Sequence, residues 1–427
     1  MRRSFPRRAQ TVDIATLITS QAQDLSDRLH MHRRELFPPK AEKPLRAFQL
    51  HEVAKFLGVK GGYLRNLSLE GKGPLPAATS SGRRSYTAEQ IQELRAFLDE
   101  TGRATRRYLP HRRGNEHLQV LAIVNFKGGS CKTTTAAHLA QHLALRGFRV
   151  LAIDLDPQAS LSALCGLQPE LDIGLNESLY GAIRYDQEAR SLSTIIRRTN
   201  FPGLDIVPGN IELSEFEYET PRILAESGGH AGPIFFSRLD HALADIRDAY
   251  DVVVIDCPPQ LGYLTMAALC SATGVLVTIH PQMLDIMSMC QFLLMTGNVL
   301  AQLQKAGVAF QYDWMRYLIT RFEPGDGPQI QMVEFMRSLF GAYVLEHPML
   351  KSVAISDAGM TKQTLYEVER RLFTPATYDR AMACLDAVNG EIEQLICAAW
   401  GRSAGPALIS GAPDVGPAPL TEAASGA

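Results

Sequence analysis

The sequence predicts an α/β fold, with a mostly parallel sheet flanked by helices, preceded by an all-α or winged helix-turn-helix N-terminal domain. From Leu118 onward, short continuous apolar runs alternate with helical patterns, which is typical of a buried parallel sheet. A glycine-bearing turn joins the first of these runs to a helix. The charge also changes sign along the chain. Residues 1–115 carry 22 basic and 11 acidic side chains, whereas the remaining residues carry 21 basic and 34 acidic side chains. Such an asymmetry suggests a nucleic-acid-binding module joined to a different kind of domain, although a solvated basic surface would look the same.

Composition limits the class of protein. A chain of 427 residues is too long for one ordinary domain, and 46% hydrophobic residues is a globular value. The basic N-terminus is not followed by the apolar segment of a secretory signal, and no apolar run reaches the roughly 18 residues of a membrane span. Seven scattered cysteines without a C-x-x-C pair are expected to be buried, reduced thiols. We therefore expect a cytoplasmic protein with no membrane partner.

Five segments are expected along the chain. They are an amphipathic, candidate dimerisation helix in 1–44, a winged helix-turn-helix in 45–101, a basic linker in 102–117, the α/β domain in 118–400 and a flexible tail in 401–427. Within the first segment, apolar residues recur at near-helical spacing between residues 11 and 36. That stripe must be buried against its own domain or a second subunit.

The second segment carries helix signals around a glycine turn. Gln49–Leu57 has apolar residues on one face, Gly58 ends this helix, and Tyr63, Leu64 and Leu67 mark the next. A basic wing is expected over residues 81–86, followed by a third helix that opens with the capping box Thr87–Gln90.

This order resembles the winged helix-turn-helix of the MerR type, which has V-A-x-x-L-G-V, then Leu-Arg, then G-x-R-x-Y before a helix. Here the motifs are Val53–Val59, Leu64-Arg65 and Gly82–Tyr86, but Gly61-Gly62 weakens the start of the recognition helix. The resemblance implies DNA binding through Lys60, Tyr63, Arg65, Arg83 and Arg84.

The α/β segment is expected to contain six strands. They are Val120–Val124, Val150–Asp154, Leu204–Val207, Val252–Asp256, Gly274–Ile279 and Tyr317–Thr320. Chemistry-bearing residues follow three of them, and ligands bind outside the carboxyl ends of strands in an open parallel sheet. Those residues can therefore converge on one crevice.

The loop after the first strand is the strongest signal for a phosphate cradle. Free N–H groups of the turn and first helical turn point at an anion, and Lys132 and Thr133 add a cation and a hydroxyl suited to Mg²⁺. The ordinary pattern G-x-x-x-x-G-K-[ST] fails, however, because Phe126 and Cys131 occupy its glycine positions. An extra lysine, Lys127, lies beside a Gly-Gly pair instead.

Two later strands end in carboxylates. Asp154 and Asp156 lie in the motif D-L-D-P-Q, and Asp256 lies in V-I-D-C-P-P. A carboxylate at such a position can hold Mg²⁺ through water or orient an attacking water. A lone aspartate after a strand is more often a helix cap, but the three segments together favour a nucleotide site.

These three motifs resemble those of the deviant Walker A ATPases of the ParA type, a P-loop NTPase fold, over roughly Leu118–Trp400. With the N-terminal segments, the chain looks like the larger plasmid ParA proteins, particularly the RepA partition proteins of RepABC replicons. Their pattern N-F-K-G-G-S-x-K-T-T-T, then L-D-P-Q-A-S-L-S, occurs here as Asn125–Thr135 and Leu155–Ser162. The family usually has a small residue, often Gly, at the position of Cys131.

The resemblance implies a slow, Mg²⁺-dependent ATPase. Lys132 would contact the β- and γ-phosphates, Lys127 would reach the nucleotide of a dimer partner, and Asp156 would orient the hydrolytic water. The nucleotide-binding loop would comprise Gly128, Gly129, Ser130, Cys131, Lys132, Thr133 and Thr134. The metal would be Mg²⁺ at Thr133, supported by Asp154 and Asp256.

The resemblance also implies partners. Homodimers formed with ATP would bind DNA nonspecifically on the nucleoid, and a ParB/RepB-type centromere-binding protein would stimulate hydrolysis. The N-terminal domain would bind the operator of its own operon. Late basic residues are candidates for the nonspecific DNA surface, namely Lys351, Lys362, Arg370 and Arg371.

Three alternatives remain at this point. A MinD-like membrane-cycling ATPase needs an amphipathic C-terminal helix, which the proline-bearing tail disfavours. An iron–sulfur reductase of the nitrogenase iron-protein type needs a symmetric cysteine pair. A nucleotide-gated transcriptional repressor with little hydrolysis would carry the same motifs.

Overall fold

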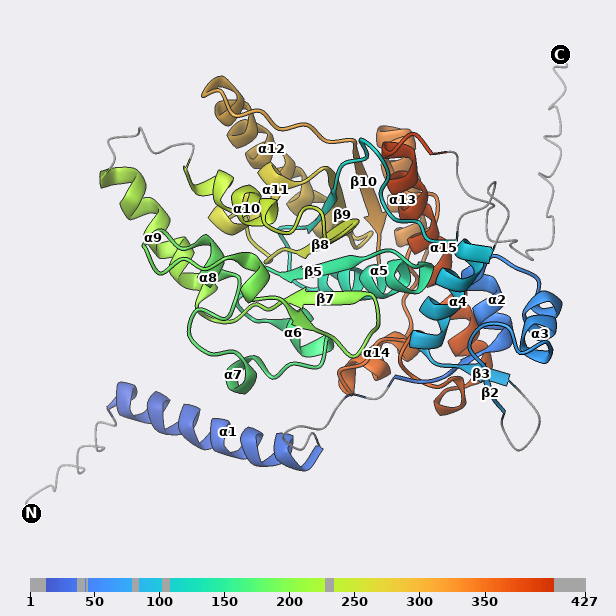
Figure 1. Ribbon diagram of the computed structural model, residues 1–427. Coiled ribbons are helices and arrows are strands. Elements are labelled where there is room, and N and C mark those ends of the chain that lie inside the picture. Colours follow the sequence, from blue (N-terminus) through green and yellow to red (C-terminus); the bar gives the residue numbers. More distant parts are fainter. Residues whose placement is uncertain are drawn as a thin grey trace, which may run out of the picture. The chain divides into compact units, whose positions relative to one another are not determined.

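The computed structural model describes residues 13–36, 43, 45–78, 84–101, 108–226 and 234–402, without the side chains of 29–36 (Figure 1). The chain divides into two compact units, residues 1–44 and 45–427. In the first unit, α1 (Ile14–Leu36) confirms the expected helix. Asp13 caps it by accepting from Ala15 N–H at 3.2 Å, and Ile14, Ile18 and Leu25 on its apolar stripe are exposed.

The second unit begins with a small helical module. It contains α2 (Leu50–Leu57), α3 (Gly61–Leu69) and α4 (Ala88–Thr101), with an antiparallel sheet of order β1-β3-β2 from β1 (Phe48–Gln49), β2 (Ala77–Ala78) and β3 (Arg84–Tyr86). Gly58 ends α2 in the left-handed conformation, with φ of 62°. The capping box of α4 is present, since Thr87 N–H donates to Gln90 Oε1 at 3.0 Å and Gln90 N–H to Thr87 Oγ1 at 3.3 Å. The expected helix–turn–helix and the described part of the wing are therefore confirmed as secondary structure.

The main sheet has seven strands in the order β10-β9-β4-β8-β5-β7-β6. All neighbouring pairs are parallel except β6 with β7. The strands are β4 (Gln119–Val124), β5 (Val150–Asp154), β6 (Arg197–Arg198), β7 (Leu204–Val207), β8 (Val252–Asp256), β9 (Gly274–Ile279) and β10 (Trp314–Ile319). The six strands expected from the sequence are confirmed, and the short antiparallel edge strand β6 is additional.

Helices cover both faces of this sheet (Figure 1). Alternate residues of β4 point into two different hydrophobic cores, one on each face of the sheet. Leu121 and Ile123 belong to the first core, whereas Val120 and Val124 belong to the second. The first core includes residues of α5 (Lys132–Arg146), α14 (Val353–Met360) and α15 (Pro375–Ala399). The second includes residues of α9 (Leu213–Glu226), α10 (Ile234–Ala244), α11 (Tyr263–Ser271), α12 (Met283–Lys305) and α13 (Gly327–Phe340). The shorter helices are α6 (Ser160–Leu164), α7 (Pro169–Asp172), α8 (Tyr180–Ile183), η1 (Leu192–Thr194), η2 (Gly341–Tyr343) and η3 (Arg370–Leu372).

The helical module packs directly on the end of α5. Arg95 of α4 is buried, and its Nη2 donates to the carbonyls of Phe56 in α2 and Leu145 in α5, both at 2.7 Å. Gly147, with φ of 98°, makes room for this arginine, because a Cβ there would lie 2.6 Å from Arg95 Cδ. Gln92 Nε2 donates to the Ala144 carbonyl at 2.7 Å. Arg146 of α5 in turn donates from Nη1 to the Phe56 carbonyl of α2 at 2.8 Å, so the last turn of α5 is hydrogen-bonded to two helices of the module.

The helix α12 corrects one expectation from the sequence. By length and composition alone, its 23 residues are long and apolar enough to cross a membrane, and 28% of that window is buried. Phe292 and Met289 anchor the helix in the core over β9. One such helix is weak evidence for a membrane span, because core helices of soluble proteins pass the same test.

Candidate functional site

The glycine-bearing loop is fixed by polar contacts to neighbouring strand ends. The Asn125 side chain donates to the Thr278 carbonyl and accepts from Lys127 N–H at 3.0 Å. Ser130 is buried, and its hydroxyl accepts from Thr278 Oγ1 at 3.1 Å while its carbonyl accepts from Thr320 Oγ1, also at 3.1 Å. Side chains at the ends of β9 and β10 therefore hold the loop in shape before any ligand arrives.

Cys131 occupies a position that favours glycine. Its φ is 65°, in the left-handed region, where a side chain is strained by about 1–2 kcal/mol. This explains why the related pattern usually has Gly here. Burial raises the pKa of its thiol, with opposing effects from Arg321 and Lys132, so Cys131 is not an activated thiolate. All seven cysteines are free, and most are at least partly buried, but Cys290 is exposed, contrary to the expectation that all are buried.

The two lysines of the loop lie in different surroundings. Lys132, at the first position of α5, is buried, and its Nζ donates to the Lys127 carbonyl at 3.3 Å. Burial lowers its pKa, an effect that Asp256 partly offsets. Lys127 is partly exposed, and its Nζ forms an ion pair at 2.8 Å with Asp285, which is buried at the start of α12.

The two strand-end carboxylates lie side by side. Asp154 and Asp256 are register partners in the parallel pair β5–β8, and both are fully buried. Burial raises the pKa of each carboxyl group, and their proximity raises that of Asp256 further. Neutralisation by a cation would relieve this unfavourable pair.

The two groups differ in their hydrogen bonds. Asp154 Oδ2 accepts from the amide and the hydroxyl of Ser162, both at 2.7 Å, so it holds the loop that carries Asp156. Among the residues that the structure describes, no donor meets hydrogen-bond geometry at either oxygen of Asp256, although the Thr133 hydroxyl and Lys132 lie close enough to lower its pKa. Asp256 is therefore the carboxylate with both oxygens available to a ligand.

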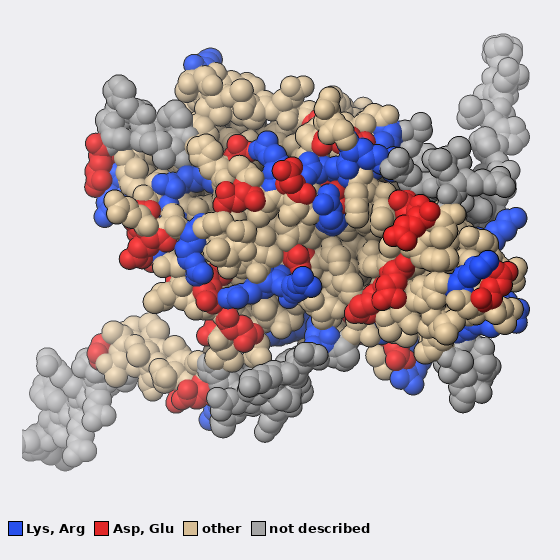
Figure 2. Space-filling model, in the orientation of Figure 1, with Lys and Arg blue, Asp and Glu red and all other residues tan. Residues whose placement is uncertain are grey.

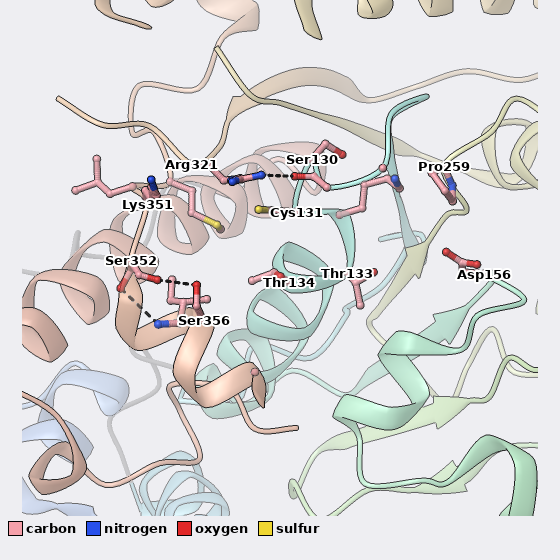
Figure 3. Close-up of a pocket in the computed structure, with 17 residues that line it drawn as sticks. Ser130, Cys131, Thr133, Thr134, Asp156, Pro259, Arg321, Lys351, Ser352 and Ser356 are labelled. Atoms are coloured by element: carbon pink, nitrogen blue, oxygen red, sulfur yellow. Dashed lines mark hydrogen bonds between the residues drawn. The ribbon is translucent and has the colours of Figure 1, made fainter. Parts of the chain in front are cut away.

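A cavity of about 480 Å³ opens in front of the loop (Figure 3). This volume lies within the usual range of about 300–1,000 Å³ for small-molecule sites. One side is formed by Gly128–Thr134, Asp156 and Pro259. The other is formed by residues that follow β10 and either precede α14 or lie in it, which are Arg321, Met349, Leu350, Lys351, Ser352, Ile355, Ser356 and Gly359.

This second side of the cavity is not predicted by the sequence patterns. Arg321 Nη1 donates to the Gly129 carbonyl at 3.4 Å, and Arg321 adopts a left-handed φ of 53°. Its position directly after an apolar strand is the same signal that identified the aspartates. Lys351, proposed from the sequence as a DNA contact, lines the cavity and pairs with Glu323 at 2.9 Å.

The site fits a nucleotide with its cation. Within the described part of the chain, no side chain caps the first turn of α5, so its N–H groups remain for an anion, and Lys132 is the first residue of this helix. The part of the chain that the structure describes contains no cluster of three or more His, Cys, Asp or Glu residues that could hold a metal. A cation here would therefore depend on oxygen ligands from Thr133, Asp256, water and phosphate, which is the usual environment of Mg²⁺.

The proposed DNA-binding residues are partly described. Lys60, Tyr63 and Arg65 at the start of α3 are exposed, and Arg84 in β3 is partly exposed. Arg83 lies outside the described residues. Of the late basic residues, Arg370 pairs with Asp379 at 2.6 Å and Arg371 with Glu369. The described part of the linker is also engaged, since Arg112 Nε donates to the Tyr250 carbonyl at 3.0 Å.

Comparison with known proteins decides the family. A model described as an AAA domain matches residues 118–306. The chain is 60% identical to a putative replication protein A of Sinorhizobium fredii over 395 residues, covering 92% of this chain and 97% of that protein. It is 30% identical to protein SopA of Escherichia coli K12 over 371 residues, covering 85% of this chain and 92% of that protein. The chain belongs to the ParA/SopA family of partition ATPases.

Solved structures agree with this fold. A partition protein matches 88% of this chain and 98% of its own, at 17% identity and a TM-score of 0.57. A variant of McdA from Cyanothece, in complex with ATP, matches 68% of this chain and 98% of its own, at 19% identity and a TM-score of 0.51. At these identities the likeness concerns the fold alone. The P-loop α/β architecture expected from the sequence is confirmed.

Proposed function

We propose that this partition ATPase forms a dimer on binding ATP and Mg²⁺, binds DNA in that state, and hydrolyses ATP when a ParB-type protein engages it. The observation that carries the proposal is the buried carboxylate pair beside the start of α5, in which Asp256 has two available oxygens and Lys132 lies close enough to lower the pKa of Asp256. A generic anion site would not need this pair.

The roles of the residues follow from their positions. Lys132 and the N–H groups of Gly128–Thr134 would hold the β- and γ-phosphates. Thr133 and Asp256 would hold Mg²⁺, which neutralises phosphate charge when bound. Asp154 would act indirectly: its hydrogen bonds to Ser162 would fix the loop that carries Asp156, and Asp156 would orient the attacking water. The cavity side at Arg321 would receive the nucleoside.

Lys127 would serve the partner subunit. In the isolated chain its ammonium is held by Asp285, so reaching a nucleotide across a dimer interface requires this ion pair to open. Because Asp285 is buried, losing its partner is unfavourable unless the new contact compensates. Dimerisation is therefore expected only when phosphate charge is present to receive Lys127.

The helical module would bind the operator of the protein's own operon. Lys60, Tyr63 and Arg65 share the exposed start of α3, and Arg84 lies in β3 of the wing. These would be the two contact elements of a winged helix-turn-helix. Nonspecific DNA binding by the ATP dimer would keep the protein on the nucleoid in the cytoplasm. The ion pairs of Arg370 and Arg371 make these two residues weaker candidates for that surface.

Phosphate release tests the proposal. Purified protein should hydrolyse ATP slowly with Mg²⁺, and faster with DNA and a ParB-type protein. Lys132→Ala should remove both turnover and ATP-dependent dimerisation. If neither DNA nor the ParB-type protein raises turnover while ATP still alters operator binding, the chain is a nucleotide-gated repressor and the partition-motor proposal fails. ATP-bound dimers of Lys132→Ala would refute the phosphate assignment.

A further inference from the structure

The helix α11 is capped by a carboxylate from a distant helix. Its own N-cap residue is Gly262, which has no side chain, and its first turn contains no acidic residue. Glu217 of α9 accepts from Tyr263 N–H at 2.9 Å and from Leu264 N–H at 3.0 Å, one hydrogen bond to each carboxylate oxygen. The free N–H groups at the start of a helix favour a negative charge. This double contact therefore fixes the first turn of α11 against α9.

Gly262 is an independent sign that the chain is built around this contact. A Cβ at this position would clash with both carboxylate oxygens of Glu217, and would lie 2.6 Å from Oε2. The φ of Gly262 is −100°, which any residue adopts, so the turn itself does not require glycine. The close approach of the Glu217 carboxylate therefore explains why the N-cap residue of α11 is a glycine.

The loop between β8 and α11 belongs to the candidate site. It follows Asp256, the last residue of β8, and its Pro259 lines the cavity together with Asp156 (Figure 3). The same loop is tied to the first turn of α11, because the Thr265 hydroxyl donates to the Gln260 carbonyl at 2.6 Å. A displacement of this turn would therefore displace the loop that forms part of the cavity wall.

The segment that leads into α9 is attached to the other carboxylate loop. The Gly209 N–H donates to Ser162 Oγ at 3.0 Å, and a Cβ on Gly209 would lie 2.7 Å from the Asp154 carbonyl oxygen. The Ser162 hydroxyl in turn donates to Asp154 Oδ2 at 2.7 Å. Glu217 follows Gly209 by eight residues, so one short segment contacts both the Asp154–Asp156 loop and α11. This segment therefore sets the spacing between the two loops.

Glu217 differs from other glutamates of the same helix. Helix α9 contains four glutamates, and Glu215 and Glu226 are exposed, as is usual on a surface helix. Figure 2 shows acidic side chains at the surface over α9, on the left of the view. Glu217 is partly buried, and both of its oxygens accept from backbone N–H groups. A solvated surface charge does not account for this arrangement.

We propose that Glu217 is a positioning residue for ATP hydrolysis, which by capping α11 holds the Pro258–Gly262 loop at the spacing from Asp156 that orients the attacking water. In this step a water oxygen bonds to the γ-phosphorus while the bond to the bridging oxygen of ADP breaks, and a proton is released with the phosphate. The inference rests on the proposed function. Because the separate loop Gly128–Thr134 would hold the phosphates, loss of Glu217 should slow hydrolysis without weakening nucleotide binding.

Separate measurements of single-turnover hydrolysis and of ATP affinity on the full chain test this proposal. Glu217→Ala should lower the hydrolysis rate constant of the ATP-bound protein by about tenfold or more, because a misplacement of about 1 Å can slow a reaction about 100-fold. The dissociation constant for ATP should stay within about twofold of the parent value. Glu215→Ala is the matched control, since Glu215 is exposed on the same helix, and it should change neither quantity. A Glu217→Ala variant with a lower thermal midpoint but the parent's rate constant while folded would make Glu217 a structural cap only and overturn the proposal.

A second-site variant tests the capping contact itself. Gly262→Ser alone should slow hydrolysis, because its Cβ would clash with the Glu217 carboxylate. Once Glu217 is alanine the space is free, and a serine at the N-cap position can accept from a first-turn N–H of α11. Glu217→Ala/Gly262→Ser should therefore hydrolyse ATP faster than Glu217→Ala, and a double variant that is no faster would overturn the proposal. A parent that does not hydrolyse ATP would refute the proposed function as well, whereas an active parent with an equally active Glu217→Ala would refute this inference alone.

Discussion

Acid should destabilise the ATPase domain through one histidine of α5. His138 is buried; its Nδ1 lies 2.7 Å from the Thr134 carbonyl, and its Nε2 accepts from Leu365 N–H at 3.3 Å. These two contacts fit only the neutral ring with the proton on Nδ1. Burial lowers the pKa to about 4, against weak opposing effects of the Thr134 carbonyl and Glu367.

The direction and the size of this pH effect follow from the linkage between proton binding and folding. The unfolded chain takes up a proton near pH 6.5 and the folded chain only near pH 4, so the stability of the neutral ring is full above about pH 6.5 and is lost as the pH falls towards 4. Each pH unit in that window removes about 1.4 kcal/mol, so going from about pH 7.5 to about pH 5 removes roughly 2 kcal/mol. Asp154 and Asp256, whose pKa values are raised, act in the opposite direction, so the total pH dependence alone is not diagnostic.

The diagnostic quantity is the difference between the parent and His138→Gln. Glutamine keeps one donor and one acceptor but does not titrate. Urea unfolding can be followed by the fluorescence of Trp314 and Trp400, both buried in the α/β domain. The free-energy gap between parent and variant should shrink by about 2 kcal/mol between about pH 7.5 and about pH 5. A gap that stays constant across this range would refute the neutral, buried assignment.

Three further outcomes are expected. Asp256→Asn should raise the thermal midpoint of the ligand-free protein, because it removes an unpaired buried carboxyl group, and should abolish the extra stabilisation by Mg²⁺ and ATP; a parent-like ligand shift in the same scan would contradict the metal assignment. Asp285→Asn should release Lys127 and lower the ATP concentration for half-maximal dimerisation in light scattering, whereas an increase would mean that Asp285 supports the dimer. Arg83→Ala/Arg84→Ala should weaken operator binding and reduce the slope of its salt dependence by about one per lost phosphate contact, and an unchanged slope would place the contacts elsewhere.

The sheet and one half of the site could be predicted from the sequence because they depend on local patterns. Buried parallel strands read as continuous apolar runs, and the residues directly after them lie at one edge of the sheet. Asp154 and Asp256 were found in this way, and the structure places them as register partners. Their difference in hydrogen bonding could not be predicted, since it depends on Ser162, eight residues after Asp154.

The other half of the site depends on contacts between distant segments. Arg321 and the Met349–Gly359 region reach the phosphate loop only through the order of β9 and β10 in the sheet. The ion pair of Lys127 with Asp285 joins residues 158 positions apart. No local pattern records such pairings, which is also why Lys351 was assigned to DNA rather than to the cavity.

The hydrogen bonds at the two ends of α5 have a mechanical consequence. The helix is a rod of 15 residues, about 22 Å long, with the phosphate cradle at one end and the carbonyls bound by Arg95 and Gln92 at the other. A ligand that tilts its first turn would swing its last turn, and α4 would move with it. In the proposed dimer, the spacing between the two helical modules would then depend on the nucleotide, because these hydrogen bonds would transmit the change.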